Sequence, residues 1–415
     1  MMNRIGDISS AVEYAKQAPY YERVLPTQAV DKLEDFHAIP FLDNKTYRQN
    51  TPPNNNDLCA KNPAGCFVFS SGGTTSEPRL ILRDFDDIGD QHEYFQGLNL
   101  GPADTVINLF MPGIWGVFST TNIALSHLGC RIIPQGGTRL DEEAMAQIKF
   151  FVKRFGANCF TGMPSTILTV ADYLKNDDEA RAKVNKIYCL GEKVFQSTLD
   201  YLCKIFPNAV VKSAYGCMES AAIGYQCANK TLSDYHVFPY QYVEIVDPET
   251  GNIVPDEQFG EIIITTLKRR LIPLVRYRTG DIGALTTDEC ECGGETQTLN
   301  VKGRSQDMIV SASLHVAVDQ IRNILSKFPE CSDAFQIIVG NYNHRDAIKI
   351  MIESESPSTN LAGRIKEKCI SEIQDLESEL QTGRIHSFEI VCVAKNSIER
   401  VRSTGKIKRI IDLRK

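Results

Sequence analysis

The chain has 415 residues, of which 42% are hydrophobic and 23% charged, and its formal net charge is −7. This length exceeds what one hydrophobic core normally serves, so we expect a globular protein of two or more domains. The acidic balance argues against nucleic-acid binding, which needs a basic domain or stripe. The sequence has no run of about 18 apolar residues that could span a membrane, and its polar N-terminus lacks the apolar segment of a signal peptide, so we expect a cytoplasmic protein.

Two short apolar runs, residues 66–69 and 79–82, flank a segment made wholly of glycine, serine and threonine, residues 70–76. Each run has the composition of a strand. The backbone N–H groups of a glycine-rich turn can converge on an anion, and hydroxyl groups add donors without bulk. A flexible surface loop explains the same composition equally well. Because the chain has no G-x-x-x-x-G-K-[ST] motif, such a loop would hold phosphate without the helix of a Walker loop.

From about residue 104, expected strands alternate with expected helices. The strands are 104–110, 130–136, 157–164, 184–192 and 209–216, and the helices are 117–129, 141–156, 165–175, opened by Ser165, and 197–206. Such alternation predicts crossover units and a largely parallel sheet. Ligands bind at the carboxyl ends of such strands. Gly191 and Glu192 follow one strand, and we expect Tyr215 and Glu219 on the loop that leaves another.

After residue 235 the pattern changes to strands around a Pro-Glu-Thr-Gly turn, residues 242–254 and 260–267, which is typical of antiparallel pairing. From about residue 308 we expect a helix at 318–328, strands at 334–340, 347–354 and 387–394, and a polar helix at 359–381. The fold class is therefore α/β. Residues 1–306 form a large domain with parallel-rich sheets flanked by helices plus an antiparallel subdomain, and residues 307–415 form a small, mobile α+β domain.

Four further segments carry polar residues on turns: AYGCMES (214–220), VRYRTGDIGAL (275–285), VKGRSQDMIV (301–310) and STGKIKRIIDLRK (403–415). Taken singly, each residue has a structural interpretation: Asp281 would form a turn, Glu219 would be a carboxylate at a helix start and Lys406 would be a solvated lysine. In this order and spacing, however, the chain resembles the adenylate-forming superfamily of acyl-CoA synthetases, adenylation domains and luciferases. It is most similar to the phenylacetate-CoA ligase branch, and the resemblance covers residues 66–414.

The resemblance implies an enzyme that uses ATP and Mg²⁺ to convert a small carboxylic acid into an acyl-adenylate with release of pyrophosphate, and the likeness to this branch implies an aromatic acid. The nucleotide would be bound by Ser70, Ser71, Gly72, Gly73, Thr74, Thr75, Glu192, Tyr215, Gly216, Asp281 and Arg304. In this set the hydroxyl-rich segment holds the β- and γ-phosphates, and Asp281 accepts hydrogen bonds from the ribose hydroxyls.

The same resemblance implies that Glu219 holds Mg²⁺ and that Lys406 stabilises the charge that develops during adenylation. Asp307 would be the hinge about which the small domain turns between two half-reactions. The acid pocket would include Ile114, Trp115, Gly116, Val117 and Tyr215. For the 114–117 stretch, the start of a core helix is an equally good interpretation.

The thirteen cysteines fall into two groups. Most are scattered in apolar segments, as are Cys159, Cys189, Cys203 and Cys392, and we expect buried, reduced thiols there. Cys290 and Cys292 on a tight turn, with Cys227 and His236, offer the four ligands of a tetrahedral structural zinc site, and relatives have a similar arrangement. The alternatives are unconnected thiols with a surface histidine, or a zinc-ribbon interaction module.

Several residues depart from the family pattern. The hydroxyl-rich segment has an extra glycine, and Ser76 and Glu77 follow where relatives have Gly-Lys. Met218 replaces a serine or threonine, and Gln306 replaces an aspartate. Ser313 replaces a glycine and Val318 a proline, which narrows the expected passage for CoA. The acyl acceptor is therefore left open between CoA, an amine, a carrier protein and a reductase in secondary metabolism. A degenerate protein that binds nucleotide without turnover is a further alternative.

Overall fold

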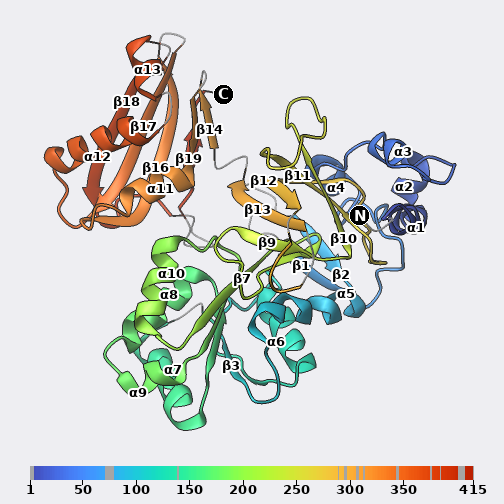
Figure 1. Cartoon of the computed structure of the whole chain (residues 1–415), viewed down its shortest axis with the longest axis horizontal. Helices are drawn as coiled ribbons and strands as arrows, with labels where there is room; N and C mark the ends of the chain where they lie inside the picture. Colours follow the sequence, from blue (N-terminus) through green and yellow to red (C-terminus); the bar gives the residue numbers. More distant parts are fainter. Residues whose placement is uncertain are drawn as a thin grey trace. The chain divides into compact units, whose positions relative to one another are not determined.

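The computed structural model of the chain describes residues 4–70, 79–137, 140–287, 289–293, 297–304, 308–311, 314–342, 345–373, 376–383, 385–400 and 407–414. The chain divides into two compact units, Met1–Lys302 and Gly303–Lys415, which we call the N-terminal and C-terminal units (Figure 1). The domain boundary expected after residue 306 falls at residues 305–307, outside the described residues, and stays a prediction.

Among its described residues, the N-terminal unit is built on one 11-stranded sheet with the strand order β10-β11-β12-β13-β9-β8-β7-β6-β5-β3-β4. The last five strands of this order run parallel, as the alternating pattern predicts. The strands are β3 (Thr105–Asn108), β4 (Arg131–Ile133), β5 (Cys159–Gly162), β6 (Lys186–Cys189) and β7 (Val210–Cys217); the intervening helices are α6 (Val117–His127), α7 (Glu142–Phe155), α8 (Pro164–Leu174), α9 (Asp178–Lys183) and α10 (Gln196–Ile205). Strands β3 and β5 are buried along their whole length, as parallel strands covered on both faces are.

Local sequence determines where these helices begin and end. Asp141 caps α7 by accepting a hydrogen bond from the backbone N–H of Ala144 at 3.0 Å, and Gly156 ends the helix in the left-handed conformation. The expected start of α8 at Ser165 is wrong. The helix begins at Pro164, because the fixed φ of proline suits the first helical position.

Beyond β7 the same sheet continues with antiparallel strands. β7 pairs in parallel with β6 and antiparallel with β8 (Ala221–Tyr225). The other strands are β9 (Asp234–Val237), β10 (Gln241–Val246), β11 (Gly260–Thr266), β12 (Tyr277–Thr287) and β13 (Gln297–Arg304). The expected antiparallel strands are confirmed, and they continue the sheet of parallel strands. β1 (Phe67–Ser70) and β2 (Leu80–Arg83) form a separate antiparallel pair.

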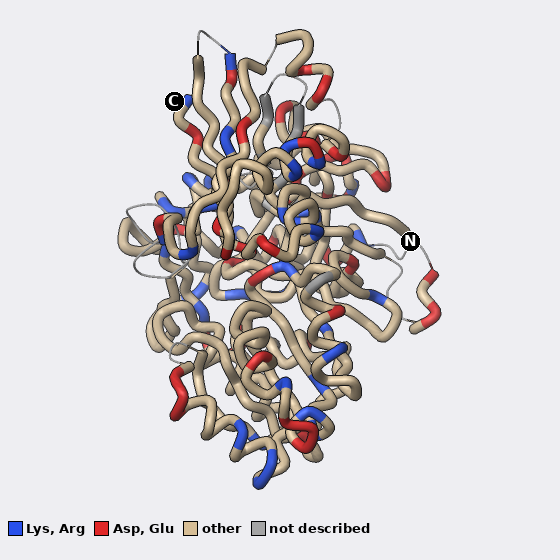
Figure 2. Tube along the Cα trace, turned by 90° about the vertical axis from the view of Figure 1, so that its left-hand side faces the viewer, with Lys and Arg blue, Asp and Glu red and all other residues tan. Residues whose placement is uncertain are grey.

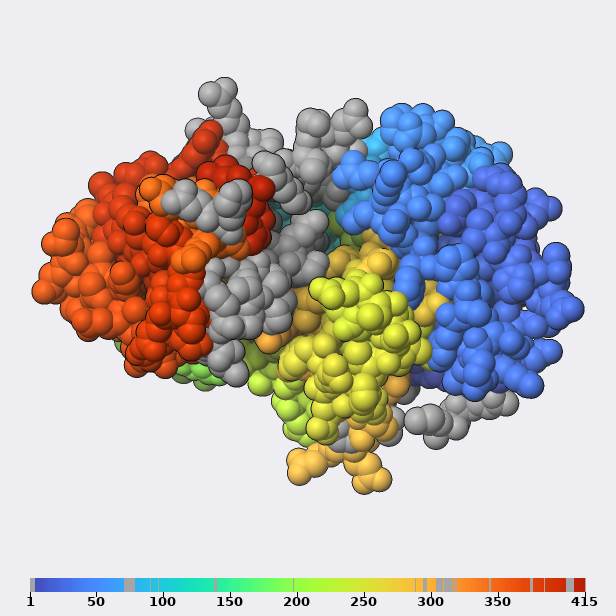
Figure 3. All heavy atoms as spheres, turned by 90° about the horizontal axis from the view of Figure 1, so that it is seen from above, coloured from blue at the N-terminus to red at the C-terminus, as the bar shows by residue number. Residues whose placement is uncertain are grey.

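Short helices at the start of the chain pack on the antiparallel strands. They are α1 (Ile5–Ala15), α2 (Pro19–Val24), α3 (Leu33–His37) and α4 (Asn44–Gln49); α5 (Phe85–Gly89) and the 3₁₀ helix η1 (Asp90–Leu98) follow β2. In Figure 3 the blue N-terminal segment lies beside the yellow chain near residues 240–260. The guanidinium of Arg276, 3% exposed, joins the two regions. It donates to the carbonyl oxygens of His37 and Ile39 and pairs with the Glu244 carboxylate at 2.9 Å.

The C-terminal unit contains a four-stranded sheet of order β18-β17-β16-β19, a β14–β15 hairpin and helices, which confirms the α+β class. Its elements are β14 (Met308–Ser311), β15 (Leu314–Ala317), α11 (Val318–Leu325), β16 (Cys331–Tyr342), β17 (Arg345–Ser354), α12 (Thr359–Glu372), α13 (Leu376–Gln381), β18 (Ile385–Ala394) and β19 (Ile410–Asp412). The single helix expected over residues 359–381 is wrong. α12 ends at Glu372 because Ile373 takes an extended backbone and buries its side chain in the core.

Charged residues of both signs are interspersed along the trace (Figure 2). Within the described part of the chain, no helix has the length and apolar character that crossing a bilayer requires. The cysteines are free thiols. Cys159 and Cys189 are buried as expected, whereas Cys203 is exposed because α10 buries its neighbours Leu202 and Ile205.

Replacing Arg276 by alanine is expected to lower the free energy of unfolding by about 3–5 kcal/mol, because it leaves the buried Glu244 carboxylate without its cation. Arg23→Ala is the matched control, since Arg23 pairs with Asp57 while 58% exposed. This control should cost less than about 1 kcal/mol. Chemical denaturation measures both losses, and equal values would show that Arg276 contributes no more than a surface pair.

Candidate active site

The hydroxyl of Tyr215 and the carboxylate of Asp281 meet inside the N-terminal unit. The hydroxyl donates to Asp281 Oδ2 at 2.7 Å, and both residues are buried. Burial, reinforced by the carboxylate, raises the pKa of Tyr215 well above its usual value, so the hydroxyl keeps its proton and remains a donor. The expected loop position of Tyr215 is wrong, because the residue lies within β7, while Asp281 lies in β12.

Glu219 lies in the turn between β7 and β8, where its side chain is only 2% exposed. Burial raises the pKa of the neighbouring Cys217 thiol to about 12, and the carboxylates of Glu219 and Asp281 add to this rise. The segments at 214–220 and 275–285 meet through the hydrogen bond between Tyr215 and Asp281.

The first end of the hydroxyl-rich segment contacts the expected acid pocket. The backbone N–H of Ser70 donates to the carbonyl of Ile114 at 2.8 Å. Gly116 lies so close to the ring of Phe69 that an added Cβ would come within 2.6 Å of it. Trp115 and Val117 are partly buried at the start of α6, while Ile114 is 53% exposed. The contact brings the 114–117 stretch to the start of the segment, and its role as a pocket stays a prediction.

The other end of the segment contacts Glu219. Arg79 Nε lies 2.6 Å from Glu219 Oε1, and the Arg79 guanidinium also donates to the Tyr277 hydroxyl at 3.2 Å. Ser70 and Arg79, the described residues on either side of 71–78, therefore contact Ile114 and Glu219, respectively.

Gly216 and Glu192, which are also expected to bind the nucleotide, have structural roles in the N-terminal unit. A Cβ on Gly216 would lie 2.3 Å from the carbonyl oxygen of Ala221 and 2.7 Å from the hydroxyl of Tyr94, so only glycine fits there. The Glu192 carboxylate accepts a hydrogen bond from the backbone N–H of Ser165 at 3.1 Å, at the start of α8. Their contacts with nucleotide stay predictions.

Other expected site residues lie outside the described part of the chain: Ser71, Gly72, Gly73, Thr74, Thr75, Asp307 and Lys406. Four of the residues that depart from the family pattern also lie outside the described part of the chain: Ser76, Glu77, Gln306 and Ser313. Arg304 ends β13, and the structure describes its backbone alone. The roles given to these residues stay predictions.

The structure brings together the four residues expected to bind zinc. Their ligand atoms all lie within 4.8 Å of one another: Cys227, His236, Cys290 and Cys292. Cys227 Sγ is 3.8 Å from Cys290 Sγ, and Cys292 Sγ is 3.4 Å from His236 Nε2. The backbone N–H of Cys292 lowers the pKa of the Cys290 thiol, which favours the thiolate that metals bind. The expected surface position of a lone histidine does not hold, since His236 is fully buried on β9.

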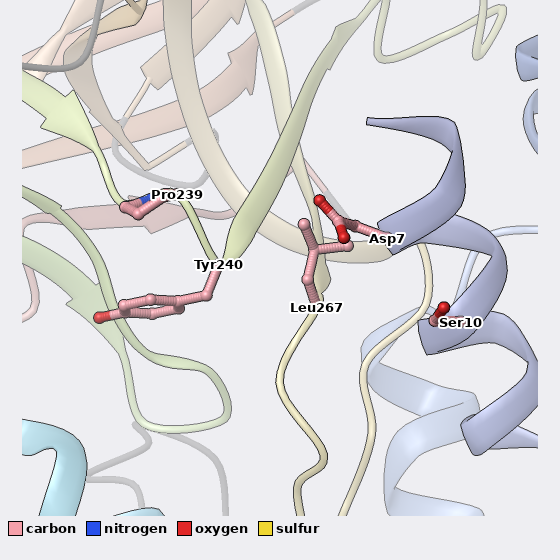
Figure 4. Close-up of a pocket in the computed structure, with 5 residues that line it drawn as sticks. All are labelled: Asp7, Ser10, Pro239, Tyr240 and Leu267. Carbon is pink, nitrogen blue, oxygen red and sulfur yellow. The ribbon is translucent and has the colours of Figure 1, made fainter. Parts of the chain in front are cut away.

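A separate groove of about 330 Å³ lies between α1 and the turn that joins β9 to β10 (Figure 4). It is lined by Asp7, Ser10, Pro239, Tyr240 and Leu267. None of these five is an expected site residue, so the groove is not part of the candidate site that contains Asp281 and Glu219.

Sequence reasoning missed two arginines next to the hydroxyl-rich segment. Arg79 pairs with Glu219, and Arg83, 4% exposed, donates to the carbonyl of Met218 at 2.7 Å. Both hold the turn that carries Glu219. The only signal was the presence of two basic residues in a run otherwise suited to a buried strand.

Known protein families and individual relatives match almost the whole chain. The model of the AMP-binding enzyme family matches residues 8–267, and that of the AMP-binding enzyme C-terminal domain matches residues 318–414. Phenylacetate-coenzyme A ligase of Aromatoleum evansii is 22% identical over 413 residues, covering 96% of this chain and 91% of the relative. The enzyme of the same name from Thermus thermophilus is 23% identical over 429 residues, covering 96% and 93%.

Among solved structures, a 2-hydroxyisobutyryl-CoA ligase in its postadenylation state superposes with a TM-score of 0.75 at 19% identity, covering 98% of this chain and 88% of that chain. ATP-bound MatB from Rhodopseudomonas palustris gives a TM-score of 0.61 at 14% identity, covering 82% and 66%. At these identities the likeness concerns the fold.

Replacing Tyr215 by phenylalanine is expected to lower the free energy of unfolding by about 1–3 kcal/mol, because the buried Asp281 carboxylate loses a charge-assisted donor. Tyr201→Phe is the matched control. The Tyr201 hydroxyl also donates to an aspartate, Asp172, but on the surface. The free energy of unfolding of Tyr201→Phe should fall by no more than about 0.5 kcal/mol. Urea denaturation of the two variants compares them, and a Tyr215→Phe loss as small as the control would mean that the bond contributes nothing to stability.

Proposed function

Because the chain belongs to the family of AMP-binding enzymes and is an adenylate-forming ligase, we propose that it joins a small aromatic carboxylic acid to coenzyme A in two steps. In the first, a carboxylate oxygen attacks the α-phosphate of ATP, the α–β phosphoanhydride bond breaks and pyrophosphate leaves with its electron pair. In the second, the CoA thiol attacks the acyl carbon, AMP leaves and the thiol proton passes to solvent.

The observation that carries the proposal is the convergence of separate motifs on one buried place. Tyr215 and Asp281 share a hydrogen bond of 2.7 Å, and the Arg79 guanidinium joins Glu219 to the hydroxyl of Tyr277, which lies on the same strand as Asp281. Arg79, at the end of the hydroxyl-rich segment, reaches Glu219 at 2.6 Å. These contacts support a site in which Asp281 would accept the ribose hydroxyls, Glu219 would hold a hard cation and the hydroxyl-rich segment would hold phosphate.

Each of these groups has a task in the proposed reaction. Asp281 accepts the ribose hydroxyls while Tyr215 holds the carboxylate in place and lies beside the adenine. Glu219 holds Mg²⁺, which when bound neutralises phosphate charge. Residues 70–75 donate to the β- and γ-phosphates, with Glu192, Gly216 and Arg304 completing the nucleotide site. Lys406 stabilises the negative charge that grows on the α-phosphate oxygens, and Asp307 is the hinge between the half-reactions.

The choice of acid and acceptor rests on the names of the relatives, which are phenylacetate-coenzyme A ligases over more than nine-tenths of this chain. The aromatic ring would lie against Trp115, Ile114 and Val117, next to Gly116, whose backbone packs closely against the ring of Phe69. A half-length similarity to a D-alanyl carrier protein ligase gives the carrier-protein acceptor less support.

Exchange of labelled pyrophosphate into ATP tests the first step. Phenylacetate, benzoate and a medium-chain fatty acid are offered in turn, and an aromatic acid is expected to give the fastest exchange. Lys406→Ala should lower this exchange by about 100-fold or more while ATP binding persists, because the lysine acts on the transition state.

Two other results would contradict the proposal. If ATP binds but none of these acids supports exchange, the protein is a nucleotide-binding member without turnover. If an acid is adenylated but CoA yields no thioester by mass spectrometry, the acceptor is an amine, a carrier protein or a reductase.

We further propose that Cys227, His236, Cys290 and Cys292 hold one structural zinc ion. Three sulfur atoms and one ring nitrogen within 4.8 Å of one another fit the four-coordinate preference of Zn²⁺. The ion would join the loop after β8 to strand β9 and to the turn after β12.

Metal analysis of the purified protein is expected to find about one zinc ion per chain. Cys290→Ser should lose the ion and lower the melting temperature, because metal affinity becomes folding free energy. Cys203→Ser is the matched control, since Cys203 is a free, exposed thiol. Equal zinc content in the two variants, or no zinc in the wild type, would refute the site.

A further inference from the structure

Lys212 occupies a buried position that lysines rarely take. It lies on β7 and is only 5% exposed. Its ammonium donates to the backbone carbonyls of Ala228 and Lys230, both at 3.0 Å. Within the described part of the chain, no carboxylate pairs with this ammonium. A buried cation is costly without a partner of opposite charge, so the position points to negative charge nearby.

The carbonyls that Lys212 binds belong to the loop between β8 and β9, residues 226–233, which carries Cys227. Burial lowers the pKa of the Lys212 ammonium, and the Cys227 sulfur opposes this effect. Cys227 is one of four residues whose ligand atoms lie within 4.8 Å of one another, and we call them the Cys/His cluster: Cys227, His236, Cys290 and Cys292. Lys212 is therefore a buried cation next to a group of candidate metal ligands.

Neutral contacts already hold this loop in place. The backbone N–H of Ser213, the residue after Lys212, donates to the side-chain oxygen of Gln226 at 2.8 Å. The amide of Gln226 in turn donates to the carbonyl of Leu232 at 3.0 Å. Both ends of the loop are thus tied to β7 without any charge, so the geometry of the loop alone does not account for a buried ammonium.

A bound zinc ion would give the cluster the missing negative charge. Zinc binds thiolates and neutral imidazole, so the three cysteines would bring three negative charges and the ion two positive ones. One negative charge remains close to Cys227 and His236, which are 8% and 0% exposed. Water screens such a buried charge poorly, and it screens Lys230, the partly exposed lysine of the loop itself, more strongly. Lys212 is thus the cation placed to compensate this charge.

Resting on the proposed zinc site, we infer that Lys212 is a positioning residue for zinc, whose buried ammonium compensates the negative charge of the loaded Cys/His cluster while it holds the loop of Cys227. Its charge raises the zinc affinity because it stabilises the loaded, negatively charged cluster more than the metal-free one. The two carbonyl contacts fix where that charge lies. The ammonium has no lone pair, so Lys212 does not coordinate the ion itself.

Competition between the full chain and a chromophoric zinc chelator measures the zinc affinity. Lys212→Met keeps an unbranched stem and removes the charge, and it is expected to weaken zinc binding by about tenfold or more. Lys183→Met is the matched control. The Lys183 ammonium also donates to a backbone carbonyl, that of Lys153 at 2.7 Å, but it lies on α9, outside the cluster. This control should change the zinc Kd by less than about twofold.

A change in the cluster itself separates the effect of charge from that of loop packing. Cys292→His exchanges one thiolate for a neutral imidazole, so the zinc-loaded cluster carries no net charge. Cys292 is exposed, which leaves room for the ring. In this background, Lys212→Met should weaken zinc binding by less than about threefold. An ammonium that only held the loop would cost the same zinc affinity in both backgrounds.

Equal losses in the two backgrounds, or no loss in either, would overturn the inference and leave the zinc site standing. If Lys212→Met does not fold, Lys212→Gln gives the same comparison. If Cys292→His binds too little zinc to measure, Cys290→His takes its place. A wild type that holds no zinc overturns the zinc site and this inference together, whereas pyrophosphate exchange still tests the ligase activity.

Discussion

A buried carboxylate is costly unless a donor or a cation faces it. Asp281 and Glu219 both meet this constraint through partners distant in the sequence: Tyr215 donates to the first, and Arg79 pairs with the second. These pairs require β12, β7 and the β1–β2 hairpin to be held in fixed relation. β7 makes this possible, because it pairs in parallel with β6 on one side and antiparallel with β8 on the other.

The arrangement explains why the candidate site lies where the sheet changes its strand direction. The parallel strands end at the segments after Cys189 and Cys217, as the rule for such sheets predicts. The antiparallel strands then return Asp281 to the same region. Two sequence patterns, the alternating strands and helices and the antiparallel strands, thus contribute to one sheet and to one candidate site.

Local signals account for what the sequence predicts well. The strands and helices of residues 104–217 follow from buried apolar runs and caps such as Asp141. The errors concern the ends of helices: α8 begins one residue earlier than expected, at Pro164, and core packing of Ile373 ends α12. For the site, ordered motifs indicated Tyr215, Asp281 and the Cys/His cluster. Arg79 carried no such signal, because a lone arginine becomes informative only once its buried partner is known.

In the C-terminal unit, the residues just before the segment that contains Lys406 are bound to the buried carboxylate of Glu353. Arg400 forms two bonds to the Glu353 carboxylate, at 3.2 and 2.9 Å, and an isolated bridge joins Arg400 to Ile407. Glu353 lies at the end of β17 and also accepts from the backbone N–H of Ile398 at 2.9 Å.

Downstream, β19 pairs with β16. Both flanks of residues 401–406 are therefore tied to one sheet, with the charged anchor Glu353 almost fully buried. Lys406, the lysine of the proposed reaction, lies between these two flanks in the sequence. In the proposed reaction, its approach to the nucleotide and its withdrawal would thus depend on rotation of the whole unit about the hinge, which is how one chain can complete adenylation before the acceptor attacks.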